Sequence, residues 1–191
     1  MKIKIRYNAP VTLSFALVAT IILAADQLLG TEIIPSLFMM PPRSQFSFDS
    51  IADWIRLFTH IAGHADWSHL LGNFAFILLL GPILEEKYGS ILVLLMLLIT
   101  ALVTGLLNGF FSDSALLGAS GVVFMMILLA SFTNIRGGEI PLTFILVVAL
   151  YLVREIIGAF NAGDQVAQFA HIAGGVCGSL FGFLRPRKSN S

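Results

Sequence analysis

Residues 91–107 read ILVLLMLLITALVTGLL, an apolar run without a single charged side chain. A bilayer core about 30 Å thick is crossed by roughly 20 apolar helical residues. The run therefore predicts a membrane-spanning helix. Five further apolar segments are expected to span the membrane with it, and the second and fourth of the six are short for a full crossing. In chain order the other five are residues 11–29, 70–84, 120–132, 140–157 and 168–184.

The composition of the 191 residues agrees with this prediction. Hydrophobic residues make up 57% and charged residues only 12%, whereas a soluble domain carries about 25% charged residues. This excludes a disordered chain, a soluble nucleic-acid binder and a secreted disulfide scaffold, since Cys177 is the only cysteine. We expect an all-α, polytopic membrane protein, a bundle of six transmembrane helices that forms a single domain over residues 1–191.

The basic residues predict the orientation of the bundle. Excess lysine and arginine mark the cytoplasmic side of a membrane protein, which places both tails, residues 1–10 and 185–191, in the cytoplasm and predicts a plasma (inner) membrane location. The first span is expected to stay uncleaved, because Leu23, two residues before Ala25, is not small and the signal-peptidase site is therefore poor. The basic residues on the predicted cytoplasmic side are Lys2, Lys4, Arg6, Lys87, Arg136, Arg185, Arg187 and Lys188, against Arg43, Arg56 and Arg154 on the other side.

Residues 31–68 form the longest stretch outside the predicted spans. They mix aromatic and aliphatic side chains with histidine and charged residues, and Trp54 and Trp67 are typical of the headgroup region. The pair Pro41-Pro42 breaks any helix there. We expect an outer loop with structure that lies in the membrane interface.

Ser120 lies in the sequence Gly118-Ala119-Ser120-Gly121, at the start of the short fourth span. Small residues there could serve only close helix packing. However, a helix from residue 120 to 132 is about 20 Å long, so its N-terminus is expected below the outer surface, with residues 112–117 dipping in to reach it. A helix N-terminus offers free amide donors and a positive dipole end, which suit a nucleophile with an oxyanion site.

His171 lies in the sixth span, one turn before Gly174 on a Gly-x-x-x-Gly face that continues to Gly178. A buried histidine bonded to a carbonyl group would explain the residue equally well. The close-packing face could instead bring the imidazole within reach of a hydroxyl on the fourth span, as a general base requires. No acidic residue occurs in the fourth or sixth span, so a Ser-His pair would lack a carboxylate partner.

Two pairs of residues that contain histidine lie just before the second span and at its start. His69 and Asn73 are four residues apart and share a helix face. They either fix helix packing or donate hydrogen bonds to an oxyanion. His60 and His64 are also four apart, but no glutamate follows His60, so a structural role is favoured over a metal site. No metal or other cofactor is expected.

In this order and on these spans, the motifs resemble the rhomboid family of intramembrane serine proteases over residues 54–182. The Gly-x-Ser-Gly motif corresponds to residues 118–121 and the Ala-His-x-x-Gly-x-x-x-Gly motif to residues 170–178. The His-x-x-x-Asn motif corresponds to residues 69–73. The turn Glu85-Glu86-Lys87-Tyr88-Gly89 is also similar to the family's turn after the second span.

The resemblance implies a nucleophile at Ser120 and a general base at His171. His69, Asn73 and the backbone amide of Ser120 would form the oxyanion hole. Gly174 would permit close contact between the fourth and sixth helices, and the fifth span would be the gate for substrate. The resemblance also implies that Arg56 stabilises the outer loop and that His60 and His64 form hydrogen bonds in it.

Two positions depart from the family pattern. Trp54 and Arg56 are separated by one residue where the family often has them adjacent, and Phe124 stands where tyrosine often packs on the catalytic imidazole. Phe124 can pack there but cannot donate a hydrogen bond.

The sequence thus predicts an intramembrane serine endopeptidase that cleaves transmembrane helices near the outer membrane boundary. Its expected partners are the lipid bilayer and single-span membrane proteins whose helices are weakened by glycine or proline; no nucleic acid is expected, and oligomeric state is not predicted. One alternative is an inactive relative that binds membrane helices without cutting them. The other is a small transporter or channel subunit, which would place paired ionisable groups at the midplane.

Overall fold

The computed structural model describes residues 6–134, 142, 145–146, 149–150, 153 and 165–184. Within these residues the chain is helical and has no strand beyond an isolated bridge between Met40 and Leu116. The all-α prediction is therefore confirmed. The α-helices are α1 (Pro10–Leu29), α2 (Ile33–Leu37), α3 (Ile51–Thr59), α4 (Trp67–Tyr88), α5 (Ser90–Phe111), α6 (Ser120–Asn134) and α8 (Gln165–Leu184), with 3-10 turns η1 (Arg43–Gln45) and η2 (His60–Ala62).

Helices α1, α4 and α5 are long and apolar enough to cross a membrane, while α6 and α8 contain shorter apolar stretches. The predicted fifth span, residues 140–157, falls almost entirely outside the described residues. The expectation that the second span is short was wrong, because α4 has 22 residues. The Asp66 side chain caps the helix by accepting from the His69 amide at 2.7 Å, and the helix runs on through Glu86 and Lys87 to Tyr88.

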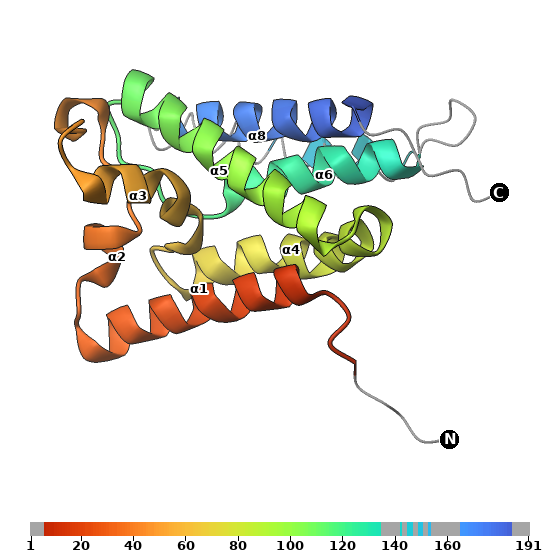
Figure 1. Cartoon of the computed structure of the whole chain (residues 1–191), viewed down its shortest axis with the longest axis horizontal. Coiled ribbons are helices and arrows are strands. Elements are labelled where there is room, and N and C mark those ends of the chain that lie inside the picture. The colour runs from red at the N-terminus through yellow and green to blue at the C-terminus, as the bar shows by residue number, and fades with distance from the viewer. Residues whose placement is uncertain are drawn as a thin grey trace.

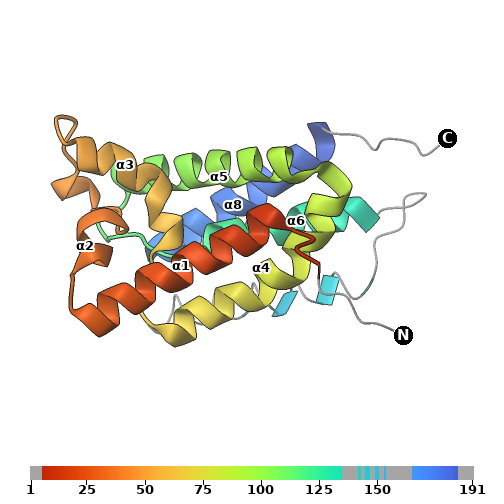
Figure 2. The ribbon, with the colours of Figure 1, turned by 60° about the horizontal axis from the view of Figure 1, so that its bottom comes forward.

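The helices form a bundle with the two predicted site helices next to each other. Helices α6 and α8 lie side by side, and α5 crosses them (Figure 1). Helices α1 and α4 pack together on another side of the bundle (Figure 2). The short helices α2 and α3 lie at one end of the bundle, whereas α6 begins part-way along its length (Figure 1). The start of α6 is therefore inside the bundle.

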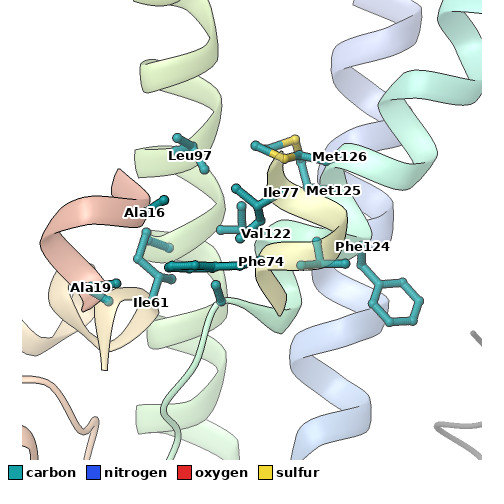
Figure 3. Packing of buried hydrophobic residues seen from close by; sticks show 14 of the residues in the cluster. Ala16, Ala19, Ile61, Phe74, Ile77, Leu97, Val122, Phe124, Met125 and Met126 are labelled. Carbon is teal, nitrogen blue, oxygen red and sulfur yellow. The ribbon is translucent and has the colours of Figure 1, made fainter. Parts of the chain in front are cut away.

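The main apolar core lies where these helices meet. Phe74 of α4 lies among Ala16 of α1, Ile61 of η2 and Val122 of α6 (Figure 3). All four side chains are less than a tenth exposed. The Phe124 ring, by contrast, points away from the centre of this cluster (Figure 3). The core thus fixes α6 from one side and leaves another of its faces to α8.

Helix α1 is attached to α4 by polar contacts at the end of the bundle away from α2 and α3. No side chain caps α1 at Ala9. Glu85 of α4 takes that role, because its carboxylate accepts from the Val11 and Thr12 amides at 3.2 and 2.6 Å and from the Thr12 hydroxyl at 2.7 Å. Gly81 lies one turn earlier, and a Cβ there would overlap Thr12. The carboxylate thus satisfies amides that would otherwise be buried without partners.

Candidate active site

The outer loop is held together by Arg56 of α3. Its guanidinium forms an ion pair with Asp53 and donates from Nε to the Ser36 carbonyl oxygen of α2 at 3.0 Å. Asp53 in turn accepts from the Ser47 amide at 3.0 Å, and the Trp54 indole donates to the Phe48 carbonyl at 2.9 Å. Arg56 thus connects α3 to α2 within the outer loop.

His60 connects this loop to α5 and to the segment before α6. Its Nδ1 lies 3.0 Å from the Arg56 carbonyl oxygen, which can only accept, so Nδ1 carries the proton. Its Nε2 lies 3.2 Å from the Thr104 hydroxyl, which donates to the Thr100 carbonyl at 2.8 Å. The His60 carbonyl accepts from the Gly118 amide at 2.9 Å. Burial lowers the pKa of His60 to about 4, so the ring is neutral at physiological pH.

The segment before α6, residues 112–119, is tied along its length to the outer loop and the end of α5. Met40 and Leu116 exchange two backbone hydrogen bonds of 2.8 and 2.9 Å. The Arg43 amide donates to the Ser112 carbonyl at 2.7 Å. Asn108 of α5 donates from its amide group to the carbonyls of Pro41 and Ser114. These bonds satisfy the irregular backbone that leads into the bundle.

Two side chains of α4 converge on Gly118 at the end of this segment. Gly118 has φ +109°, and a Cβ there would lie 2.6 Å from His69 Nε2 and 3.8 Å from Asn73 Nδ2. His69 Nδ1 accepts from the Ala65 amide at 3.5 Å, which assigns the ring proton to Nε2. The Asn73 amide group is buried, and its Nδ2 has no acceptor among the described residues. Two N–H donors therefore lie against the turn that precedes Ser120.

Helices α6 and α8 touch through their backbones. A Cβ on Gly174 would overlap the carbonyl oxygen of Gly121, and a Cβ on Gly178 would overlap that of Met125. A Cβ on Gly121 would lie 3.2 Å from the Ala170 carbonyl oxygen, next to His171. Only glycine permits an approach this close. The contact brings the α8 turn that carries His171 to the start of α6.

The His171 imidazole is buried against an aromatic ring from α6. It stacks on Phe124 with ring centroids 4.9 Å apart and an interplanar angle of 12°. His171 is 5% exposed, whereas Ser120, the first residue of α6, is partly exposed. The stack orients the imidazole plane at a site where α6 and α8 supply no carboxylate.

His64 belongs to the same cluster but has a different environment from His60. Its ring contacts His69 edge-on at 5.1 Å and Phe74 at 5.7 Å, and Nδ1 lies 3.3 Å from the Ala62 carbonyl. Burial, followed by the neighbouring His69, lowers the pKa of His64 to about 4. Since His60 bonds to Thr104 and His64 packs on His69, the two rings serve different neighbours. The described part of the chain contains no group of three potential metal ligands.

The structure thus gathers Gly118, Ser120, Gly121, Phe124, His69, Asn73, His171 and Gly174 around the start of α6, with His60, His64 and Arg56 in the loop beside them. The predicted gate span falls almost entirely outside the described residues. Sequence reasoning missed Thr104 and Asn108, which are buried in α5 and hold the loop. Polar residues inside an apolar span were the available signal for both.

A family model described as the rhomboid domain matches residues 52–188, which is more than half of the chain. The chain belongs to the rhomboid family. It is therefore an integral membrane protein and an intramembrane serine protease that acts on transmembrane substrates in the bilayer. In this rhomboid the match includes the Gly118–Gly121 motif, the Ala170–Gly178 motif and the outer loop from Ala52 onward.

The backbone contact between α6 and α8 predicts opposite effects at two adjacent glycines. Gly174→Ala should lower the free energy of unfolding by about 1–3 kcal/mol and reduce proteolysis, because the methyl group meets rigid backbone. Gly175→Ala is the matched control, since its Cβ would lie 3.8 Å from Leu128 and 3.9 Å from Phe124. That variant should be unchanged or stabilised by up to about 1 kcal/mol. Denaturation in micelles measures both; equal behaviour of the two variants would contradict the contact.

Burial of His60 predicts a loss of stability in acid. The pKa of His60 is about 4 in the folded rhomboid and 6.5 for a solvent-exposed imidazole, so the unfolded chain binds the proton first as the pH falls. Stability should therefore be complete above pH 6.5 and decline toward pH 4, by up to about 1.4 kcal/mol per pH unit for one such group. The contribution of His60 is measured by comparing the free energy of unfolding of wild type and His60→Gln between pH 4.5 and 7.5. An identical slope in the two proteins would show that His60 is not responsible.

Proposed function

We propose that this rhomboid hydrolyses peptide bonds with a dyad of Ser120 and His171. The observation that carries the proposal is the convergence of three elements on residues 118–120. Helix α8 brings the turn of His171 there through Gly174, and α4 brings the N–H groups of His69 and Asn73. Ser120 is the hydroxyl at that point and begins α6. A nucleophile, a base and oxyanion donors are the parts that acyl transfer requires.

In the proposed reaction, His171 accepts the proton of the Ser120 hydroxyl as Oγ attacks the scissile carbonyl carbon. The carbonyl π electrons move to oxygen and form the oxyanion. When the tetrahedral intermediate collapses, the C–N bond breaks and the imidazolium gives its proton to the leaving amine. Water then attacks the acyl-enzyme by the same route and releases the acid. His171 accepts this proton as the neutral imidazole, and its ring lies against Phe124.

The oxyanion hole is proposed to consist of His69 Nε2, Asn73 Nδ2 and the backbone amide of Ser120. A buried amide group without an acceptor is uncommon in a native protein and requires an explanation. Within the described part of the chain, Asn73 Nδ2 is such a group, and it lies beside the 118–120 turn. An oxyanion formed at Ser120 would supply the missing acceptor. The α6 N-terminus adds its unpaired amides and positive dipole end at the same point.

The imidazole is proposed to be oriented by stacking rather than by a third catalytic group. A carboxylate usually fixes the tautomer in serine proteases. Here the ring of Phe124 lies nearly parallel to His171, and Gly174 places the α8 backbone against α6. Phenylalanine holds the plane of the ring but leaves its two nitrogens to other partners.

The substrates are proposed to be single-span membrane proteins cut near the outer membrane boundary. A transmembrane helix satisfies its own amides, so its backbone must open before attack, and glycine or proline near the cut lowers the cost of opening. The orientation that supports an outer cut has both termini in the cytoplasm, in a plasma (inner) membrane. This orientation follows from the lysine and arginine distribution.

The dyad predicts that Ser120→Ala and His171→Ala each abolish cleavage of a tagged single-span reporter in liposomes and leave the fold intact. Ser131→Ala is the matched control, because Ser131 lies in the same helix and donates to the Leu128 carbonyl. It should retain cleavage. Residual turnover in Ser120→Ala would refute the nucleophile. Absence of cleavage in wild type, with several weakened reporters, would instead indicate a protein that binds helices without cutting them.

The oxyanion hole predicts a loss confined to the chemical step in Asn73→Ala. One donor of this kind is typically worth about 10²–10³ in kcat, and KM should change little because the bond forms in the transition state. Gly72→Ala is the control for the same turn of α4, since a Cβ there meets nothing within 4 Å. A rise in KM with unchanged kcat would place Asn73 in substrate binding instead.

A further inference from the structure

A cavity of about 540 Å³ lies at the end of the bundle where α1 begins and α4 ends. This end is opposite to α2 and α3 (Figures 1 and 2). The volume falls in the range of roughly 300–1,000 Å³ typical of small-ligand sites. The cavity shares no residue with the proposed protease site. Its walls include Arg6, Tyr7, Ile83, Glu85, Glu86 and Ser90.

The charged walls of the cavity are incompletely paired. Glu85 is occupied, since it accepts the three hydrogen bonds from Val11 and Thr12. Among the residues that the structure describes, the only salt bridge is Arg56–Asp53. Arg6 and Glu86 therefore form no ion pair with each other or with any other described residue. One guanidinium and one carboxylate thus line the same cavity without neutralising each other. An occupant that carries a positive and a negative group would complement both.

The cavity opens beside the lipid-facing surface of α4. Leu79 and Ile83 are one turn apart on this helix and are 64% and 50% exposed, as residues in contact with acyl chains are. Tyr7 is exposed, and its hydroxyl forms a hydrogen bond with the Ser14 hydroxyl in which either group can donate. Tyrosine is enriched at the membrane–water boundary. A lipid whose chains lie along Leu79 and Ile83 would have its headgroup at the cavity.

We propose that this cavity binds the headgroup of phosphatidylethanolamine, with the phosphate on Arg6 and the ammonium on Glu86. The primary ammonium has N–H groups that a carboxylate can accept, whereas the quaternary ammonium of phosphatidylcholine has none. Phosphatidylglycerol carries no cation for Glu86. The two carboxylates and one guanidinium among the described walls also disfavour a headgroup with net negative charge. The selectivity therefore comes from the glutamate, and the affinity for phosphate from the arginine.

The test is retention of lipid by the full chain in a neutral detergent, measured by native mass spectrometry. Phosphatidylethanolamine, phosphatidylcholine and phosphatidylglycerol with identical acyl chains are titrated separately. Wild type should retain one phosphatidylethanolamine with about tenfold higher apparent affinity than either other lipid, as a charge-assisted hydrogen bond allows. Glu86→Gln should bring phosphatidylethanolamine and phosphatidylcholine within about twofold, and Arg6→Gln should weaken both. The matched controls Glu32→Gln and Arg43→Gln make the same changes at the exposed outer end and should keep the preference.

Several results would overturn the proposal. Equal retention of phosphatidylethanolamine and phosphatidylcholine by wild type would do so without any variant, as would preference for phosphatidylglycerol. A preference that survives Glu86→Gln would place the lipid elsewhere. Water-soluble glycerophosphoethanolamine should bind far more weakly than the lipid, because it lacks the chains that contact α4. Equal binding would show that the cavity takes a soluble compound. Since cleavage is not measured, failure of the protease proposal would not affect this result.

Discussion

The contact between the backbones of α6 and α8 is the constraint on which the rest of the site depends. At Gly174 the carbonyl of Gly121 occupies the space that any side chain would fill. This approach determines where His171 meets α6, and it aligns the ring with Phe124 one turn after Ser120. At these glycines no side chain lies between the helices that could change its rotamer if either helix moved. The relative position of the two helices is therefore fixed by backbone contact.

A second requirement is that the irregular segment before α6 lies inside a membrane protein and must have its polar backbone satisfied. The outer loop provides the partners through Met40, Arg43 and the carbonyl of His60. Its own shape depends on Arg56, which bridges α3 to α2. The loop is thus a structural part of the candidate site, since it holds the turn on which the α4 donors converge.

Some buried polar side chains of the site have a partner at every polar atom and others do not. His64 Nε2 and Asn108 Oδ1, like Asn73 Nδ2, have no partner among the described residues. His60 has a partner at each ring nitrogen and serves as a neutral connector between the loop and α5. Asn73 is equally buried, but its Nδ2 lacks an acceptor among the described residues. Keeping such a group unpaired costs stability, about 1–3 kcal/mol for a typical buried donor. The proposed oxyanion would supply an acceptor for Asn73 during the reaction.

The sequence by itself determined the all-α membrane fold. Long apolar runs with so few charged residues cannot form the water-exposed surface of a soluble domain, whereas they can form membrane-spanning helices. It also determined the start of α6 at Ser120, and the motif order was enough for the family. It underestimated the length of α4, because neither the N-terminal cap at Asp66 nor the charged last turn of the helix is apolar. Only the tertiary structure decided that Gly121 is what Gly174 touches, that Thr104 and Asn108 hold the loop, and that Glu85 caps α1. These contacts join residues far apart in the chain, and local periodicity contains no information about which distant groups meet.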